Sequence, residues 1–209
     1  MDVQRLAREE RADLAAFLAT LTPQQWLAPT LCPQWRVRDV VAHVISYDDL
    51  GIRGLLTLAA QARFRLSRIN ATALARYTTR SPQQLLALLT DNPQPRGLLH
   101  AALGGRAGLV ETLVHHQDIR RALAQPRTIP AQRLVPALRT ALIAPDVAGP
   151  WRIRGIRLVA TDLRFSAGVG PEVRGPAEAL LMAIAGRRDA VSELSGPGQR
   201  KLATRIGGL

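Results

Sequence analysis

The sequence predicts a mainly α-helical protein that ends in a small α/β segment. Apolar residues recur at helical spacing through roughly the first two thirds of the chain, and Thr-Pro and Ser-Pro pairs mark helix starts there. Beyond Pro145, glycine and proline become frequent and apolar residues alternate with polar ones. We therefore expect a helical bundle over residues 1–145 and a small α/β domain over residues 146–209.

The first elements of the bundle follow from caps and periodicity. An amphipathic helix is expected over residues 3–20 behind an Asp2 cap. Thr22-Pro23 places a capping residue before a proline, which predicts a short helical turn that carries Trp26. The next helix should begin near Val37 and run into the 50s or 60s.

Three further helices complete the bundle. Ser81-Pro82 repeats the cap-and-proline start for a helix over residues 83–89, which the prolines after Asn92 end. A longer helix is expected over residues 107–123, and another after Pro130.

The C-terminal segment has a different residue pattern. Alternating apolar residues over 156–160 predict a strand, and a second short strand is expected around 163–166. Gly175-Pro176 opens a helix that should end at Gly186, and a short helix is expected after Gly198.

Composition narrows the class of protein. The chain has 209 residues, of which 47% are hydrophobic and 21% charged, and at this size ~70% of the unfolded surface can be buried. No apolar run approaches the ~20 residues of a membrane span, and the N-terminus lacks a signal-type apolar block. The single cysteine, Cys32, cannot form an internal disulfide. We expect a cytoplasmic protein with no membrane partner.

The net charge of +12 suggests nucleic acid, but the distribution of the charges argues against it. Of the 28 basic residues, 27 are arginine and only Lys201 is lysine, and they are spread over the whole chain. The few aromatic residues are scattered and form no repeated alternation with the arginines of the kind that a base-stacking platform requires. Nucleic-acid binding is therefore not expected.

Two histidines follow a carboxylate by four residues. His43 follows Asp39 and His115 follows Glu111, where about 0.3 such pairs are expected by chance. Residues four apart on a helix share a face, so Glu111 and His115 can hold one cation or simply form a hydrogen-bonded pair. His43 lies in an apolar stretch and is either a core histidine bonded to Asp39 or a backbone carbonyl, or a third ligand.

Local motifs add a family resemblance. The stretch TLCPQWRVRDVVAH over residues 30–43, the stretch ETLVHHQDIRR over 111–121 and the stretch GPEVRGPAEAL over 170–180 together resemble the maleylpyruvate isomerase family of mycothiol-dependent enzymes. These enzymes are DinB-like metal-binding four-helix bundles with a small C-terminal domain. The resemblance spans nearly the whole chain and does not identify a substrate.

The resemblance implies a site and a chemistry. The family's metal ligands fall on His43, Glu111 and His115, and its acid falls on Asp118. The metal it implies is divalent, usually zinc, with mycothiol as cofactor. Three protein ligands leave zinc an open position, where a bound thiol is deprotonated and becomes nucleophilic at neutral pH.

Several other residues are expected to support the site or to pack. Asp118 either orients a ligand or binds the thiol, or else pairs with a neighbouring arginine on its helix. Asp39 either supports His43 or caps its own helix. His116 points about 100° away from His115 and is expected on the surface or in packing. His100 is assigned no role, and Cys32 is expected to be a packed side chain.

Two functions remain open. The first is a metal- and mycothiol-dependent isomerase or S-transferase acting on an electrophilic small molecule. The second is a non-catalytic metal-binding or regulatory bundle protein with an acidic or nucleic-acid partner. The sequence does not decide the oligomeric state.

Overall fold

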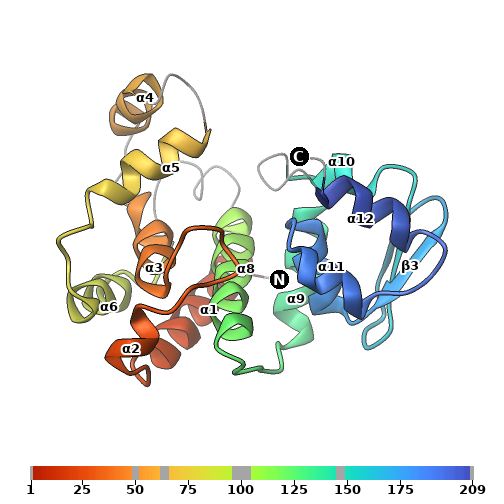
Figure 1. Ribbon diagram of the computed structural model, residues 1–209, viewed down its shortest axis with the longest axis horizontal. Helices are drawn as coiled ribbons and strands as arrows, with labels where there is room; N and C mark the ends of the chain where they lie inside the picture. The colour runs from red at the N-terminus through yellow and green to blue at the C-terminus, as the bar shows by residue number, and fades with distance from the viewer. Residues whose placement is uncertain (1, 49–51, 62–65, 96–104, 145–148, 208–209) are drawn as a thin grey trace. The chain divides into compact units, whose positions relative to one another are not determined.

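The computed structural model describes residues 2–48, 52–61, 66–95, 105–144 and 149–207. The chain forms two compact units, Met1–Arg127 and Thr128–Leu209, drawn in Figure 1. Among the described helices, none combines the length and apolar character that crossing a membrane requires.

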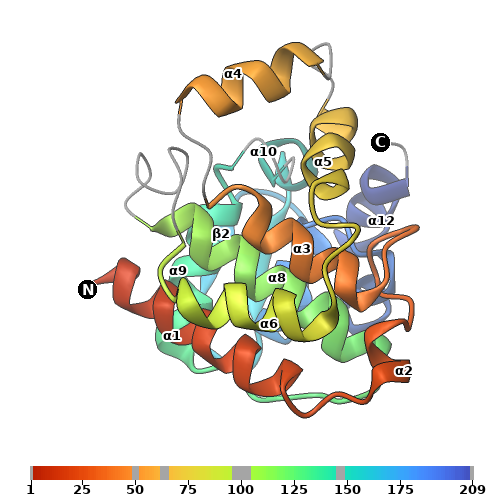
Figure 2. The same ribbon diagram turned by 90° about the vertical axis from the view of Figure 1, so that its left-hand side faces the viewer.

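The first unit is a four-helix bundle with additional helices. Helix α1 packs against α8 and α6, and α3 packs against the same two helices, so the four close into a ring (Figure 2). Helix α5 packs against α3 and α4. The helices are α1 (Val3–Leu18), α2 (Pro23–Trp26), α3 (Val37–Ser46), α4 (Ile52–Gln61), α5 (Leu66–Ala75), α6 (Pro82–Asp91) and α8 (Arg106–Ala122).

The predicted helix starts are confirmed, and their caps explain them. The Asp2 carboxylate accepts the backbone N–H of Arg5 at 3.1 Å. Thr22 and Ser81 both form capping boxes, each with a glutamine three residues later and a proline at the first helical position. Each cap satisfies N–H groups that the first helical turn leaves without a partner.

The prediction of one long helix from Val37 into the 50s or 60s is wrong. Helix α3 ends at Ser46, whose hydroxyl donates to the carbonyl of His43 at 2.8 Å. The backbone N–H of Asp48 then donates to Ile45 at 3.2 Å, a tight turn that ends the helix. This turn directs the Asp48 side chain into a buried ion pair with Arg11 on α1.

The bundle core explains how α3 and α8 are held. Apolar side chains from α1, α3, α6 and α8 form one buried cluster, which includes Leu14, Val41, Val44, Leu85 and Ile119, each at most 1% exposed. The two helices that carry the candidate ligands therefore lie in a packed, water-poor environment.

The second unit combines a small sheet with helices, as expected from the sequence. Strand β1 (Arg157–Ala160) lies between β2 (Ser166–Gly168), which is antiparallel to it, and β3 (Glu172–Gly175), which is parallel. The sequence predicted β1, placed β2 slightly early and missed β3. The helices are α9 (Ala131–Ala141), α10 (Gly149–Ile153), α11 (Ala177–Ile184), a 3-10 helix (Arg188–Glu193) and α12 (Gln199–Gly207).

The boundary between the units differs from the expected one. The sequence placed it at residues 145/146, whereas the compact units divide at Arg127 and Thr128. The reason is that α9 packs on α11, so it belongs with the second unit. The change of composition near Pro145 falls within the second unit, at residues 145–148 that lie outside the described part of the chain.

The buried Arg11–Asp48 pair gives the first prediction. Both side chains are at most 4% exposed, and both guanidinium Nη atoms bond the carboxylate. Asp48→Asn should lower the free energy of unfolding by about 3 kcal/mol, because it leaves a buried guanidinium without its counter-charge. Urea denaturation measures this.

The double variant Arg11→Met/Asp48→Leu removes both charges, so its free energy of unfolding should fall by less than that of Asp48→Asn. Asp91→Asn at the exposed end of α6 is the matched control and should change stability by less than about 0.5 kcal/mol. An equal loss in the single and double variants would contradict the electrostatic explanation.

Candidate metal site between α3 and α8

Two helices supply the candidate site. His43 lies on α3, and Glu111, His115 and Asp118 lie on α8 at positions i, i+4 and i+7, which share one helix face. His43 is 7% exposed and Asp118 is fully buried. Because α3 packs directly on α8, the shared face of α8 meets the side chain of His43.

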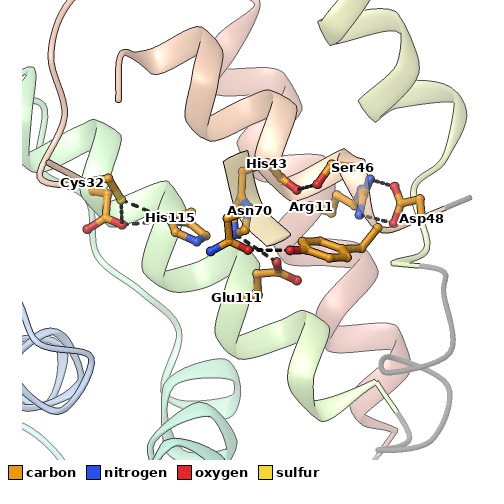
Figure 3. A network of polar contacts seen from close by, with 10 residues as sticks. Arg11, Cys32, His43, Ser46, Asp48, Asn70, Glu111 and His115 are labelled. Carbon is orange, nitrogen blue, oxygen red and sulfur yellow. Dashed lines mark hydrogen bonds and ion pairs between the residues drawn. The ribbon is translucent and has the colours of Figure 1, made fainter. Parts of the chain in front are cut away.

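The structure brings the three predicted ligands together (Figure 3). His43 Nε2 lies 3.5 Å from Glu111 Oε1. The rings of His43 and His115 meet edge to face, with their centroids 4.9 Å apart. Residues separated by about seventy positions in the chain thus lie side by side, and their role as metal ligands remains a prediction.

The fourth predicted residue, Asp118, contacts His115 directly. Asp118 Oδ2 lies 3.0 Å from His115 Nδ1. When this nitrogen donates to the carboxylate, the lone pair of the neutral ring is on Nε2, which is the nitrogen left for a metal. Histidine ligands in metal sites are typically held by a carboxylate on the other ring nitrogen, so the donor set fits a cation bound at Nε2.

The same neighbours determine the pKa of His115. Burial alone would lower the pKa of His115, but the hydrogen bonds with Asp118 and Cys32 outweigh burial and raise it to about 9. A cation that binds at His115 must therefore displace a proton at neutral pH, so metal affinity should fall as the pH falls.

Aromatic side chains enclose His43. The Trp35 ring lies 4.8 Å from the His43 ring, and the Tyr47 ring meets the His43 ring edge to face at 5.6 Å. The Tyr47 hydroxyl donates to Asn70 Oδ1 on α5. Burial, together with the negative charge of Glu111, raises the pKa of Tyr47 to about 12, so this hydroxyl keeps its proton at neutral pH.

Cys32 is packed in the bundle core, as expected, and it also contacts two of the candidate residues, which the sequence did not indicate. Its thiol donates to Asp118 Oδ2 at 3.1 Å, and Sγ lies 3.7 Å from His115 Nδ1. Among the described residues, Cys32, His115 and Asp118 form a group of metal-ligand types in which all ligand atoms lie within 4.8 Å of one another. The predicted triad is arranged less compactly than this group.

The remaining predictions have mixed outcomes. The Asp39 carboxylate accepts the backbone N–H of Arg36 at 3.0 Å, so Asp39 caps α3. His116 is fully buried, which confirms the packing alternative, and lies 3.0 Å from the Glu10 carboxylate. His100 lies outside the described residues.

The fold and the site together define a DinB-like helical bundle with a candidate metal centre made of two histidines and a carboxylate. Residues 7–92 match the family model described as the mycothiol maleylpyruvate isomerase N-terminal domain. The resemblance predicted from the sequence motifs is thereby confirmed. The matched segment contains His43, whereas Glu111 and His115 lie beyond it.

Two solved structures have the same fold. A histidine-to-alanine variant of the mycothiol-dependent maleylpyruvate isomerase aligns with a TM-score of 0.59 at 15% identity, covering 94% of this chain and 92% of that one. A second structure of the mycothiol-dependent maleylpyruvate isomerase aligns with a TM-score of 0.53 at 14% identity and the same coverage. A search of the curated proteins finds no match.

The contact between Asp118 and His115 gives the second prediction. Asp118→Asn should weaken metal binding by about 10–100-fold, because an amide neither holds the His115 ring as firmly nor raises its basicity. Competition with a chromophoric chelator measures the affinity. Asp39→Asn makes the same chemical change on α3 and should leave the metal affinity unaltered; equal weakening in both variants would contradict the role of Asp118.

A buried network on the other side of α8 gives the third prediction. His116 Nδ1 lies 3.0 Å from Glu10 Oε1, and Arg120 donates to His116 Nε2 at 2.9 Å, which fixes a neutral ring with its proton on Nδ1. Burial, followed by the nearby arginine charges, lowers the pKa of His116 to about 4 against the opposing hydrogen bond with Glu10.

The unfolded chain therefore takes up a proton at His116 near pH 6.5, before the folded protein does. Because protonation of His116 favours the unfolded chain, it should lower the free energy of unfolding by about 2 kcal/mol between pH 7 and pH 5. The contribution of His116 is isolated by comparing the pH dependence of unfolding in wild type and in His116→Gln, both in excess chelator. His115, whose raised pKa acts in the opposite direction, is present in both proteins and cancels. Equal pH dependence in both proteins would contradict the prediction.

Proposed function

We propose that this protein is a metal- and mycothiol-dependent isomerase or S-transferase that acts on an electrophilic small molecule. The observation that carries the proposal is the convergence of His43, Glu111 and His115, with Asp118 behind His115. The match of residues 7–92 to the mycothiol maleylpyruvate isomerase N-terminal domain supports mycothiol as the thiol. The two solved structures support the fold on which such a site is built.

The three ligands suit a divalent cation that binds an anionic sulfur. Two neutral imidazoles and one carboxylate leave a divalent ion with one net positive charge, which a thiolate neutralises. A cation bound there would lower the pKa of a coordinated thiol, so that a thiolate is available at neutral pH. The protein then needs no nucleophile of its own.

The chain's own residues prepare the site. Asp118 fixes the His115 ring and the position of its proton, and Trp35 lies against His43 and excludes water from that side of the ring. The Tyr47 ring packs edge to face on His43, and its hydroxyl is held by donating to Asn70 Oδ1 on α5. These groups position the ligands and do not themselves react.

The fourth prediction tests the proposed function. Glu111→Gln and His43→Ala should each reduce the thiol-dependent turnover of electrophilic substrates to background, because each removes a ligand from the proposed catalytic ion. Maleylpyruvate, with mycothiol as the thiol, is the first substrate to test. Removal of the metal from wild type with a chelator should have the same effect, and added zinc should restore turnover.

Glu9→Gln on α1 is the matched control, because it makes the same change at a partly exposed carboxylate that pairs with Arg5. It should retain the metal and full turnover. A wild-type protein that binds zinc at these ligands yet shows no turnover with mycothiol or any other low-molecular-weight thiol would instead favour a non-catalytic metal-binding protein.

A further inference from the structure

The Nδ1 side of the His115 ring faces a second set of metal-ligand atoms. Cys32 Sγ, His115 Nδ1 and Asp118 Oδ2 form a triangle with sides of 3.1, 3.7 and 3.0 Å. In a tetrahedral zinc site, sulfur, nitrogen and oxygen ligands lie about 3.3–3.6 Å from one another. The triangle needs only a few tenths of an ångström of adjustment to surround such an ion.

We propose that Cys32, Asp118 and the Nδ1 atom of His115 form a second metal site, selective for thiophilic divalent ions such as zinc and cadmium. A thiolate and a carboxylate carry two negative charges, and a neutral imidazole adds none. A divalent ion at this site is therefore fully neutralised, which suits a place where Asp118 is completely buried and Cys32 is 9% exposed.

The loop that carries Cys32 is fastened to α8. The backbone N–H of Leu31 donates to the carbonyl of Asp118 at 3.3 Å, and the N–H of Cys32 donates to the Thr30 hydroxyl at 3.2 Å. Trp35 closes the loop by donating to the carbonyl of Cys32 at 3.1 Å. The backbone thus holds the thiol beside Asp118, so the three ligands are arranged before an ion binds.

The second site shares His115 with the proposed catalytic site, which makes the two sites alternatives. A neutral imidazole has one lone pair, so it binds a metal through Nδ1 or through Nε2 but not both. Binding through Nδ1 releases to solvent both the Cys32 proton and the proton that Nδ1 shares with Asp118, and the neutral ring then carries its remaining proton on Nε2. Binding through Nε2 keeps the ring proton on Nδ1, where Asp118 accepts it. Each chain should therefore hold one ion in total.

The second site should decide which metal ions remain available to the proposed catalytic site. This consequence rests on the proposed function. An ion held by Cys32 and Asp118 is withdrawn from His43 and Glu111. Thiophilic ions should be drawn to the sulfur, whereas ions that prefer oxygen and nitrogen should remain with His43 and Glu111. Cadmium should therefore inhibit a zinc-loaded enzyme more strongly than manganese does.

The test uses full-length, metal-free protein without added thiol. Cobalt and cadmium are titrated in while sulfur-to-metal charge-transfer absorption is recorded, and bound metal is counted by elemental analysis. Because Cys32 is the only cysteine, this absorption reports on the second site alone. Wild type should show the band with cadmium and bind one ion per chain. Glu111→Gln should keep the band, and Glu9→Gln should match wild type.

Cys32→Ser should lose the band while still binding one ion through His43, Glu111 and His115. Absence of the band in wild type overturns the proposal whatever the variants do, and so does binding of two ions per chain. If Cys32→Ser binds no metal while wild type shows the band, the second site stands and the proposed catalytic site fails. The two proposals are thus separated by one set of titrations.

Discussion

The candidate site depends on one constraint, the contact between the buried Asp118 carboxylate and His115. An imidazole that could turn freely would present either nitrogen to either neighbour. Asp118 Oδ2 lies 3.0 Å from Nδ1, and this fixes which edge of the ring faces α3 and which faces the Cys32 loop. The ring position also depends on packing, because the Trp35 and His43 rings lie against the same volume. Polar contact and apolar packing together define a single orientation.

Helix α8 carries two buried polar networks, and each one is locally matched in charge. His115 and Asp118 face α3 and the Cys32 loop, whereas His116 and Gln117 face Glu10 and Arg127. The step of about 100° between neighbouring helical residues separates the two networks. Burial alone would raise the pKa of Glu10, but the hydrogen bond from His116 and the charge of Arg127 lower it. The second network therefore holds a carboxylate ionised in the core and anchors α1 to α8 beside the site.

Local signals in the sequence were sufficient for the parts of the structure that local interactions determine. The capping boxes at Thr22 and Ser81 and the apolar periodicity of α8 depend on residues within a few positions of one another. The i, i+4 spacing of Glu111 and His115 likewise follows from helix geometry. Strand β3, the end of α3 and the contact of Cys32 with Asp118 were missed because each depends on partners far away in the chain. Cys32 and Asp118 are 86 positions apart, and no spacing rule connects them.

The two proposed donor sets that share His115 differ in their charge. Around a divalent ion, His43, Glu111 and His115 leave one positive charge uncompensated, so this set is complete only when an anion joins it. Cys32 and Asp118 compensate both charges and need no further anion. The first set therefore suits an ion that must accept an external thiolate, and the second suits an ion that remains enclosed. The balance between them depends on how strongly the ion prefers the Cys32 sulfur over the external thiol, which is a property of the metal and of the cofactor concentration rather than of the fold.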